Sequence, residues 1–147
     1  MNLYWDIASQ KLVAGLSGGS VTGYTFVLRD SLPVSLYLVA EQSNVTVPYA
    51  VTSITSGHSV KFGAKAALTD TTYLVEQATW VSAGSGSTQR YEASLPLNGA
   101  SLIAAMSGLN SLALFAEFTT QDSDGKQYLS TRWTLTVVHD VIQGTET

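Results

Sequence analysis

The sequence predicts an all-β protein: an antiparallel β-sandwich, or a flattened barrel, with one short helix and a Gly/Ser-rich N-terminal arm. Three observations favour this fold. Several short segments alternate apolar with polar residues, turn-forming residues recur between them, and one stretch has the pattern of a complete β-hairpin. A chain of 147 residues can enclose one core. We divide it into an N-terminal segment 1–23, a sandwich 24–140 and a C-terminal tail 141–147.

The first 23 residues differ in composition from the rest of the chain. Leu3–Ile7 can form a short strand, whereas Ala14–Ser20 is rich in glycine and serine, which is typical of a flexible joint. Two interpretations stay open: an arm that reaches a neighbouring subunit, or an ordinary edge strand followed by a long loop. The residues assigned to the candidate arm are Leu3, Tyr4, Trp5, Gly15, Gly18 and Gly19.

From Tyr24 onward, alternating segments predict the strands of the sandwich. Asp30–Ser31 predicts a turn between the first two of them. Asn44–Ile54 is interrupted by Pro48, so it predicts an edge strand or an extended loop, because proline cannot donate to a central ladder. Gly84–Ser87 predicts a hairpin-like loop. The remaining predicted strands are Tyr24–Arg29, Pro33–Ala40, Ser59–Lys65, one strand within Thr72–Val81, and Arg90–Leu97.

One helix is predicted between these strands and the hairpin. Leu102–Met106 is a short apolar run that Asn98 or Ser101 can cap and that Gly108 can end. Its length of two to three turns predicts a crossover that closes one end of the sandwich.

The segment Ser111–Val138 contains the strongest local signal. Asp124 and Gly125 between two alternating runs predict a two-residue hairpin turn. On the outer face this register makes Glu117 and Arg132 neighbours, an opposite-charge pair that supports sheet pairing, and it also places Phe115 there. On the inner, mostly apolar face, Leu112, Leu114, Ala116 and Phe118 lie opposite Val137, Leu135, Trp133 and Thr131.

The composition indicates a surface that other subunits cover in part. Charged residues make up 12% of the chain, with 18 Ser, 17 Thr and 45% hydrophobic residues, so much apolar area has to be hidden. The net charge is -4 and the basic residues form no tract, which argues against nucleic acid as a partner. The longest apolar stretches, such as Val34–Ala40, are too short to span a bilayer, so we expect no membrane partner. The absence of cysteine excludes disulfides and fits folding in a cytosol.

No motif in the sequence predicts catalysis, a cofactor or a metal site. His58 and His139 lie in no signature of nucleophilic catalysis. The run from Asp122 to Gly125 resembles the start of a calcium loop, but the glutamate that would complete it is missing. We therefore expect a protein that is not an enzyme. The alternative is a monomeric carbohydrate- or cell-surface-binding module, with a stacking platform built from Trp5, Trp80, Trp133 and tyrosines.

The last strand and its exit, Arg132–Gly144 with Asp140-Val141-Ile142, resemble the ending of structural proteins of bacteriophages and prophages. Upstream segments fall in matching order: Phe62–Lys65, Tyr73–Val75 before Trp80, the Leu102 helix, and Ala116–Phe118. Together they resemble the domain at the N-terminus of siphophage upper baseplate proteins and of some tail or head fibres.

This resemblance implies an attachment, connector or decoration subunit of a tail, baseplate or fibre, with a capsid or head fibre as a further possibility. It implies no cofactor and no catalytic residues. The partners would be other copies of the chain, with a trimer as the first expectation, and other virion proteins. The location would be the virion, made in the cytoplasm of a bacterial host.

Overall fold

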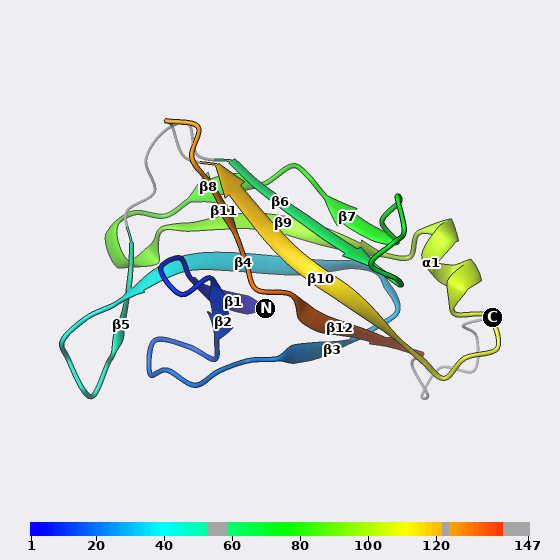
Figure 1. Ribbon diagram of the computed structural model, residues 1–147, viewed down its shortest axis with the longest axis horizontal. Coiled ribbons are helices and arrows are strands. Elements are labelled where there is room, and N and C mark those ends of the chain that lie inside the picture. The colour runs from blue at the N-terminus through cyan, green and yellow to red at the C-terminus, as the bar shows by residue number, and fades with distance from the viewer. Residues whose placement is uncertain (53–58, 122–123, 140–147) are drawn as a thin grey trace.

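The chain forms two six-stranded β-sheets that pack against each other (Figure 1). The computed structural model describes residues 1–52, 59–121 and 124–139. The predicted all-β sandwich with one short α-helix is confirmed. Its elements are β1 (Asn2–Asp6), β2 (Lys11–Val13), β3 (Gly23–Val27), β4 (Arg29–Glu41), β5 (Tyr49–Val51), β6 (Ser59–Lys65), β7 (Val75–Gln77), β8 (Val81–Ala83), the 3-10 turn η1 (Gly86–Thr88), β9 (Arg90–Leu97), α1 (Ala100–Ala105), β10 (Ser111–Gln121), β11 (Gln127–Leu129) and β12 (Trp133–Val138).

The two sheets are mixed, which corrects the prediction of purely antiparallel pairing. The first sheet has the strand order β2-β1-β4-β9-β8, with β5 paired to β4. The second has the order β3-β12-β10-β6-β7, with β11 paired to β10. β1 runs parallel to β4 and β3 runs parallel to β12. In both cases the two paired strands are far apart in the sequence. The alternation of apolar and polar residues within each strand therefore does not indicate whether the two run parallel or antiparallel.

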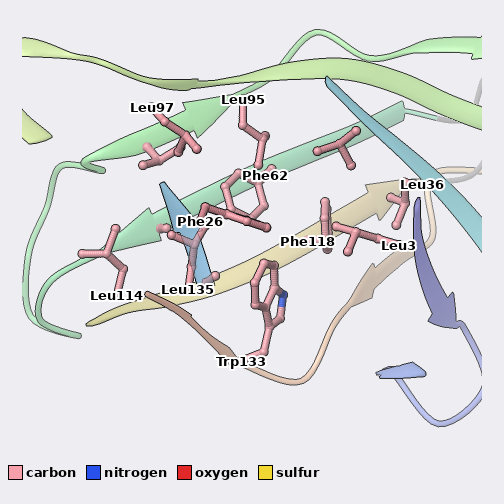
Figure 2. Packing of buried hydrophobic residues seen from close by; sticks show 14 of the residues in the cluster. Leu3, Phe26, Leu36, Phe62, Leu95, Leu97, Leu114, Phe118, Trp133 and Leu135 are labelled. Atoms are coloured by element: carbon pink, nitrogen blue, oxygen red, sulfur yellow. The ribbon is translucent and has the colours of Figure 1, made fainter. Parts of the chain in front are cut away.

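The core lies between the sheets and is centred on aromatic side chains. Phe118 of β10 lies 5.1 Å from Phe62, 6.1 Å from Trp5 and 6.0 Å from Trp133, measured between ring centroids. Figure 2 shows Phe118, Phe62 and Trp133 among leucines of both sheets. Because Trp5 comes from the first sheet and the other three from the second, these rings join the two layers.

The predicted register of the β10/β12 pair is confirmed for most of its length. Leu112 pairs with Val137, Leu114 with Leu135 and Ala116 with Trp133. All of these except half-buried Leu112 are fully or nearly buried, as are Phe118 and the predicted core residue Trp133.

Beyond Ala116 the register shifts by one residue, because the returning strand contains a bulge. Ser130, not Thr131, lies opposite Phe118: its backbone N–H donates to the Phe118 carbonyl (2.9 Å), and its hydroxyl accepts from the Phe118 N–H (2.7 Å). Thr131 is exposed, and its N–H donates to the carbonyl of Gln10 in the first sheet's β1–β2 turn. The prediction that Thr131 lies opposite Phe118 on the inner face is therefore wrong. The backbone N–H of Thr131 bonds to the other sheet, so this residue is the unpaired residue of the bulge.

The turn of this hairpin is longer than the predicted two residues. The β10/β11 ladder closes at Gln121 and Gln127, whereas a two-residue turn at Asp124–Gly125 would pair Gln121 with Tyr128. Gly125 has a φ of 85°, so the turn does use glycine for a left-handed backbone position. Asp122 and Ser123 lie outside the described residues, as do His58, the exit Asp140–Ile142 and the tail 141–147.

Two further boundaries differ from the predictions. The expected turn at Asp30–Ser31 is a register irregularity inside β4, between Arg29 and Leu32, so the strand continues through it. The N-cap residue of the helix is Gly99, not Asn98 or Ser101, and the cap makes no side-chain hydrogen bond. Its Leu102 and the following Met106 are fully buried in the main core, which agrees with a helix that closes one end of the sandwich.

The N-terminal segment is part of the sandwich of its own chain. β1 lies between β2 and β4, not at a sheet edge, and Leu3 and Trp5 have no exposed surface. On the outer side of the same sheet, Tyr4 stacks on Tyr37 with 5.1 Å between ring centroids. In the structure of the single chain, β1 and β2 are therefore strands of the first sheet, and the side chains of β1 contact both of its faces.

The Gly/Ser-rich joint forms a hydrogen-bonded turn that covers part of the first sheet. Ala14 N–H donates to the Gly19 carbonyl (2.7 Å), and Gly18 and Gly19 both have a φ of 94°. The turn places Leu16 against a second, smaller core of Val13, Val39 and Tyr49. The Tyr49 N–H donates to the Leu16 carbonyl (3.1 Å), which ties the turn to β5.

Candidate interaction surface

The outer face of the second sheet carries a group of exposed apolar side chains around a shallow hollow. Phe115 of β10 is 43% exposed, although it lies in the middle of the sheet between Lys65 of β6 and Thr134 of β12. The hollow beside it has a volume of about 220 Å³. We use the name Phe115 patch for the hollow together with the residues that line it. These residues are Gly63, Lys65, Leu68, Tyr73, Phe115, Glu117 and Arg132.

Gly63 leaves the space that the aromatic ring of Tyr73 occupies on the sheet. A Cβ atom at Gly63 would stand 2.5 Å from Cε1 of Tyr73, closer than atoms approach in proteins. The ring therefore occupies the position of the missing side chain and buries the glycine. A residue larger than glycine would displace the ring.

The connection between β6 and β7 holds the apolar part of the patch. The Asp70 carboxylate accepts from the Ala67 N–H (3.0 Å), and the Asp70 N–H donates to the Ala67 carbonyl (3.0 Å). This small turn presents Leu68, which is 48% exposed, while the Leu74 N–H donates to the Ala64 carbonyl (2.9 Å) and fixes the return to the sheet. Lys65 Nζ lies 5.7 Å from the centroid of the Tyr73 ring and donates to the Asp70 carbonyl (3.2 Å).

Two cations and one carboxylate border the apolar side chains. Glu117 pairs across the sheet with Gly63, and Lys65 pairs with Phe115. Glu117 and Arg132 both line the hollow, but within the described residues they form no ion pair, which corrects the expected cross-strand pair. The bulge beside Ser130 interrupts the register that would have placed them opposite each other. Arg132 is exposed and its guanidinium donors are available to a partner.

A second hollow lies on the outer face of the first sheet. It has a volume of about 440 Å³ and is lined by Met1, Pro33, Val34, Ser35, Val81, Glu92, Ala93 and Ser94. Glu92 is already paired with Arg90, with 2.8 Å between Oε1 and Nε. Val81 in its lining is 63% exposed. No aromatic side chain lines it, so it lacks the rings that contribute most to contacts between proteins.

The residues singled out from the sequence do not converge on one site. Leu3, Trp5 and Trp133 belong to the core, and Tyr4, half-buried, packs on the outer face of the first sheet. Gly15, Gly18 and Gly19 form the turn that covers that face. Asp124 and Gly125 lie in the exposed β10–β11 turn. Glu117 and Arg132 alone contribute to the Phe115 patch.

The three tryptophans form no exposed row. Trp5 is fully buried, Trp133 is 4% exposed, and half-buried Trp80 packs its ring against Phe118 and donates from Nε1 to the Gln77 carbonyl (3.0 Å). A stacking platform on these residues is therefore not formed. The exposed rings that remain for such a role are Tyr73 and Phe115. The sequence prediction for a sugar site included tyrosines without naming them, and it did not include Phe115.

The titratable groups show shifts that follow from burial. Burial raises the pKa of the phenol groups of Tyr24, Tyr49 and Tyr91. For Tyr49 the carboxylates of Asp6 and Glu41 add to this rise, because a second negative charge beside a carboxylate is unfavourable. Within the described residues, no three His, Asp or Glu side chains gather as a metal site would require, and no helix there has the length and apolarity to cross a membrane.

No family model matches the chain, and no curated protein matches it.

The patch was only partly visible in the sequence. The predicted hairpin register already placed Phe115 and Glu117 on the outer face. A phenylalanine at the centre of a row that faces solvent is itself an indication of an interaction site. Tyr73 and Leu68 were missed because they reach the sheet through the fold of the β6–β7 connection.

Proposed function

We propose that this chain is a non-enzymatic structural protein of a bacteriophage particle. It acts as an attachment, connector or decoration subunit of the tail, baseplate or fibre, through contacts of its β-sheets with copies of itself and with other virion proteins. The resemblance of Arg132–Gly144 to phage structural proteins suggests this role. The low charge and the high Ser/Thr content support it independently.

The observation that carries the proposal is the Phe115 patch. Interfaces between proteins are enriched in aromatic residues and arginine at their centre, with polar groups at the rim. Tyr73, Phe115 and Leu68 supply the apolar area, and Arg132, Lys65 and Glu117 surround it. Phe115, Lys65 and Glu117 lie in paired strands of the sheet, so their backbone loses little conformational entropy when a partner binds.

The experiment that tests the proposal asks whether the chain is part of purified phage particles. Particles are induced from the bacterium that carries the gene, purified on a density gradient and analysed by mass spectrometry. We expect the chain at a fixed ratio to the other virion proteins. We also expect Phe115→Glu to remove it from the particles, because a charge would replace the centre of the contact.

The matched control is Val45→Glu, which places the same charge at an apolar residue that is 95% exposed and outside the patch. This variant should be incorporated like the wild type. Particles that lack the wild-type chain would contradict the virion role, and equal incorporation of both variants would contradict the role of the patch.

A second candidate function is a monomeric carbohydrate- or cell-surface-binding module. The hollow beside Tyr73 and Phe115 favours it, since an aromatic ring next to charged hydrogen-bonding groups is what sugar rings stack on. Calorimetric titration with bacterial surface glycans tests it. Binding should be lost in Tyr73→Ala and kept in Val45→Ala, and a wild-type chain that binds no glycan would exclude this function.

A further inference from the structure

The edge of the second sheet at β3 lacks the protection that the other sheet edges have. The other strands with only one partner in the described part of the chain, namely β5, β7, β8 and β11, have three residues each. β2, also of three residues, is closed on its outer side by a bridge from Val13 to Ser20. Short edge strands and covered edges prevent pairing with other chains. β3 has five residues and none of these protections.

The sequence of β3 also favours pairing. From Ser20 to Leu28 the chain contains no charged residue and no proline. Charges and proline are the usual means by which an exposed edge avoids another strand. In contrast, β7 carries Glu76. The composition of β3, with Tyr24, Thr25, Phe26 and Val27, is typical of a strand that is paired on both sides.

The backbone groups of β3 alternate between its two edges. The Thr134 N–H donates to the Thr22 carbonyl (3.0 Å) and the Leu28 N–H donates to the Val138 carbonyl (2.8 Å), which places the even-numbered residues on the β12 side. The N–H and C=O groups of Gly23, Thr25 and Val27 therefore point away from β12. All three residues are exposed, and no described strand lies along that side of β3 (Figure 1).

We propose that the free edge of β3 pairs in antiparallel fashion with β3 of a second copy of this chain, centred on Thr25. In this register Thr25 lies opposite Thr25 of the second copy, and Gly23 lies opposite Val27. Each of these pairs exchanges both of its outward hydrogen bonds, so every free group of the edge is satisfied. The two second sheets then form one continuous sheet.

A second copy of this chain is the partner that the residues of β3 favour, because the free edge of β3 is complementary to itself. A two-fold axis requires the same surface on both sides, and a five-residue strand with its centre at Thr25 meets this condition without a like-charge contact. Threonine opposite threonine is a favourable cross-strand pair. The proposal rests on the assembly role proposed above, for which it names a partner, and it replaces the expected trimer by a two-fold dimer.

The first test uses charges at the two-fold axis. Thr25→Lys and Thr25→Glu each place like charges opposite each other, so each variant alone should lose the dimer, and its mass in light scattering should fall to the 15.6 kDa of one chain. A mixture of the two variants should recover twice that mass, because lysine then lies opposite glutamate. Thr79→Lys, which changes an exposed threonine outside β3, should dimerise like the wild type.

The second test does not depend on whether the variants with a charge at position 25 fold. The chain contains no cysteine, so Thr25→Cys introduces a single thiol. In the proposed register its Cα lies roughly 5.5 Å from its counterpart, a spacing that a disulfide can bridge. We expect a cross-linked dimer on mild oxidation, and none from Thr79→Cys beyond the background of random collision.

The outcomes separate this proposal from the proposed function. A wild-type chain that stays monomeric, a mixture that fails to associate, or equal cross-linking of both cysteine variants would overturn the β3 pairing. Incorporation of the chain into particles would be unaffected by that result. Conversely, a β3 dimer that is absent from phage particles would overturn the virion role and leave the pairing intact.

Discussion

At the scale of single residues, three buried side chains carry polar atoms that have no hydrogen-bond partner among the described residues: Nε1 of Trp5, Nε1 of Trp133 and the hydroxyl of Tyr91. Leaving a buried polar atom unpaired costs about 1–3 kcal/mol. The two indole rings pack beside Phe118, and the free energy gained by burying such large apolar surfaces offsets this cost. The hydroxyl of Tyr91 can be removed with little change in volume.

We expect Tyr91→Phe to increase the free energy of unfolding at neutral pH by roughly 1 kcal/mol, because it removes the unpaired hydroxyl and keeps the ring. It should also reduce the loss of stability at high pH. Burial raises the pKa of Tyr91 above that of the unfolded chain, which is about 10, so the folded state holds its proton more tightly. Stability is therefore complete below about pH 10 and falls as the pH rises above it.

The measurement is urea unfolding of both proteins at about pH 8 and about pH 11. The difference between the two pH values should be smaller in the variant. Some alkaline loss should remain, since the pKa values of Tyr24 and Tyr49 are raised in the same direction. An alkaline loss as large as in the wild type would show that Tyr91 does not contribute to it.

At the scale of elements, β10 contacts two different environments with its two faces. Phe118 points into the core and has no exposed surface, whereas Phe115 points outward and is 43% exposed. Both are phenylalanines of one strand, three residues apart. The strand can carry both the core and the Phe115 patch because successive side chains of a strand alternate between its faces.

This alternation predicts very different costs for the same substitution. Phe118→Ala should reduce the free energy of unfolding by about 3–5 kcal/mol, because it leaves a cavity among the rings of Trp5, Phe62 and Trp133. Phe115→Ala is the matched control and should cost less than about 1 kcal/mol. Denaturant unfolding followed by circular dichroism measures both. Similar losses for the two variants would contradict the assignment of the faces.

The elements also show how far local patterns predict structure. Alternation and the Asp124–Gly125 pair predicted β10, β12 and most of their register, because cross-strand neighbours in a hairpin are close in sequence. They did not predict the bulge at Ser130, which depends on the bond between Thr131 and Gln10 of the other sheet. Likewise, the position of Tyr73 on Gly63 depends on how the β6–β7 connection folds back.

At the scale of the whole molecule, the N-terminal segment completes the sandwich. β1 inserts parallel to β4, and Leu3 and Trp5 supply part of the main core. β2 and the following turn cover the first sheet with Val13 and Leu16. Residues 1–20 therefore carry buried area on both faces of one sheet.

Removal of residues 1–20 should prevent stable folding, because core side chains and the parallel partner of β4 are lost together. We expect the truncated chain to lack a cooperative urea transition when monitored by circular dichroism. A chain that instead unfolds cooperatively at the wild-type urea midpoint would contradict the structural role of this segment and support the arm that its composition suggests.

The sequence by itself determined the all-β class, the positions of most strands, the burial of Trp133 and the outward position of Phe115, because these follow from alternation over a few residues. Only the tertiary structure decided that β1 and β3 pair in parallel with β4 and β12, that the N-terminal segment is integrated, and that β3 has a free edge. The physical reason is that these features join segments far apart in the chain. Their free energy comes from burial and hydrogen bonds that no local pattern records.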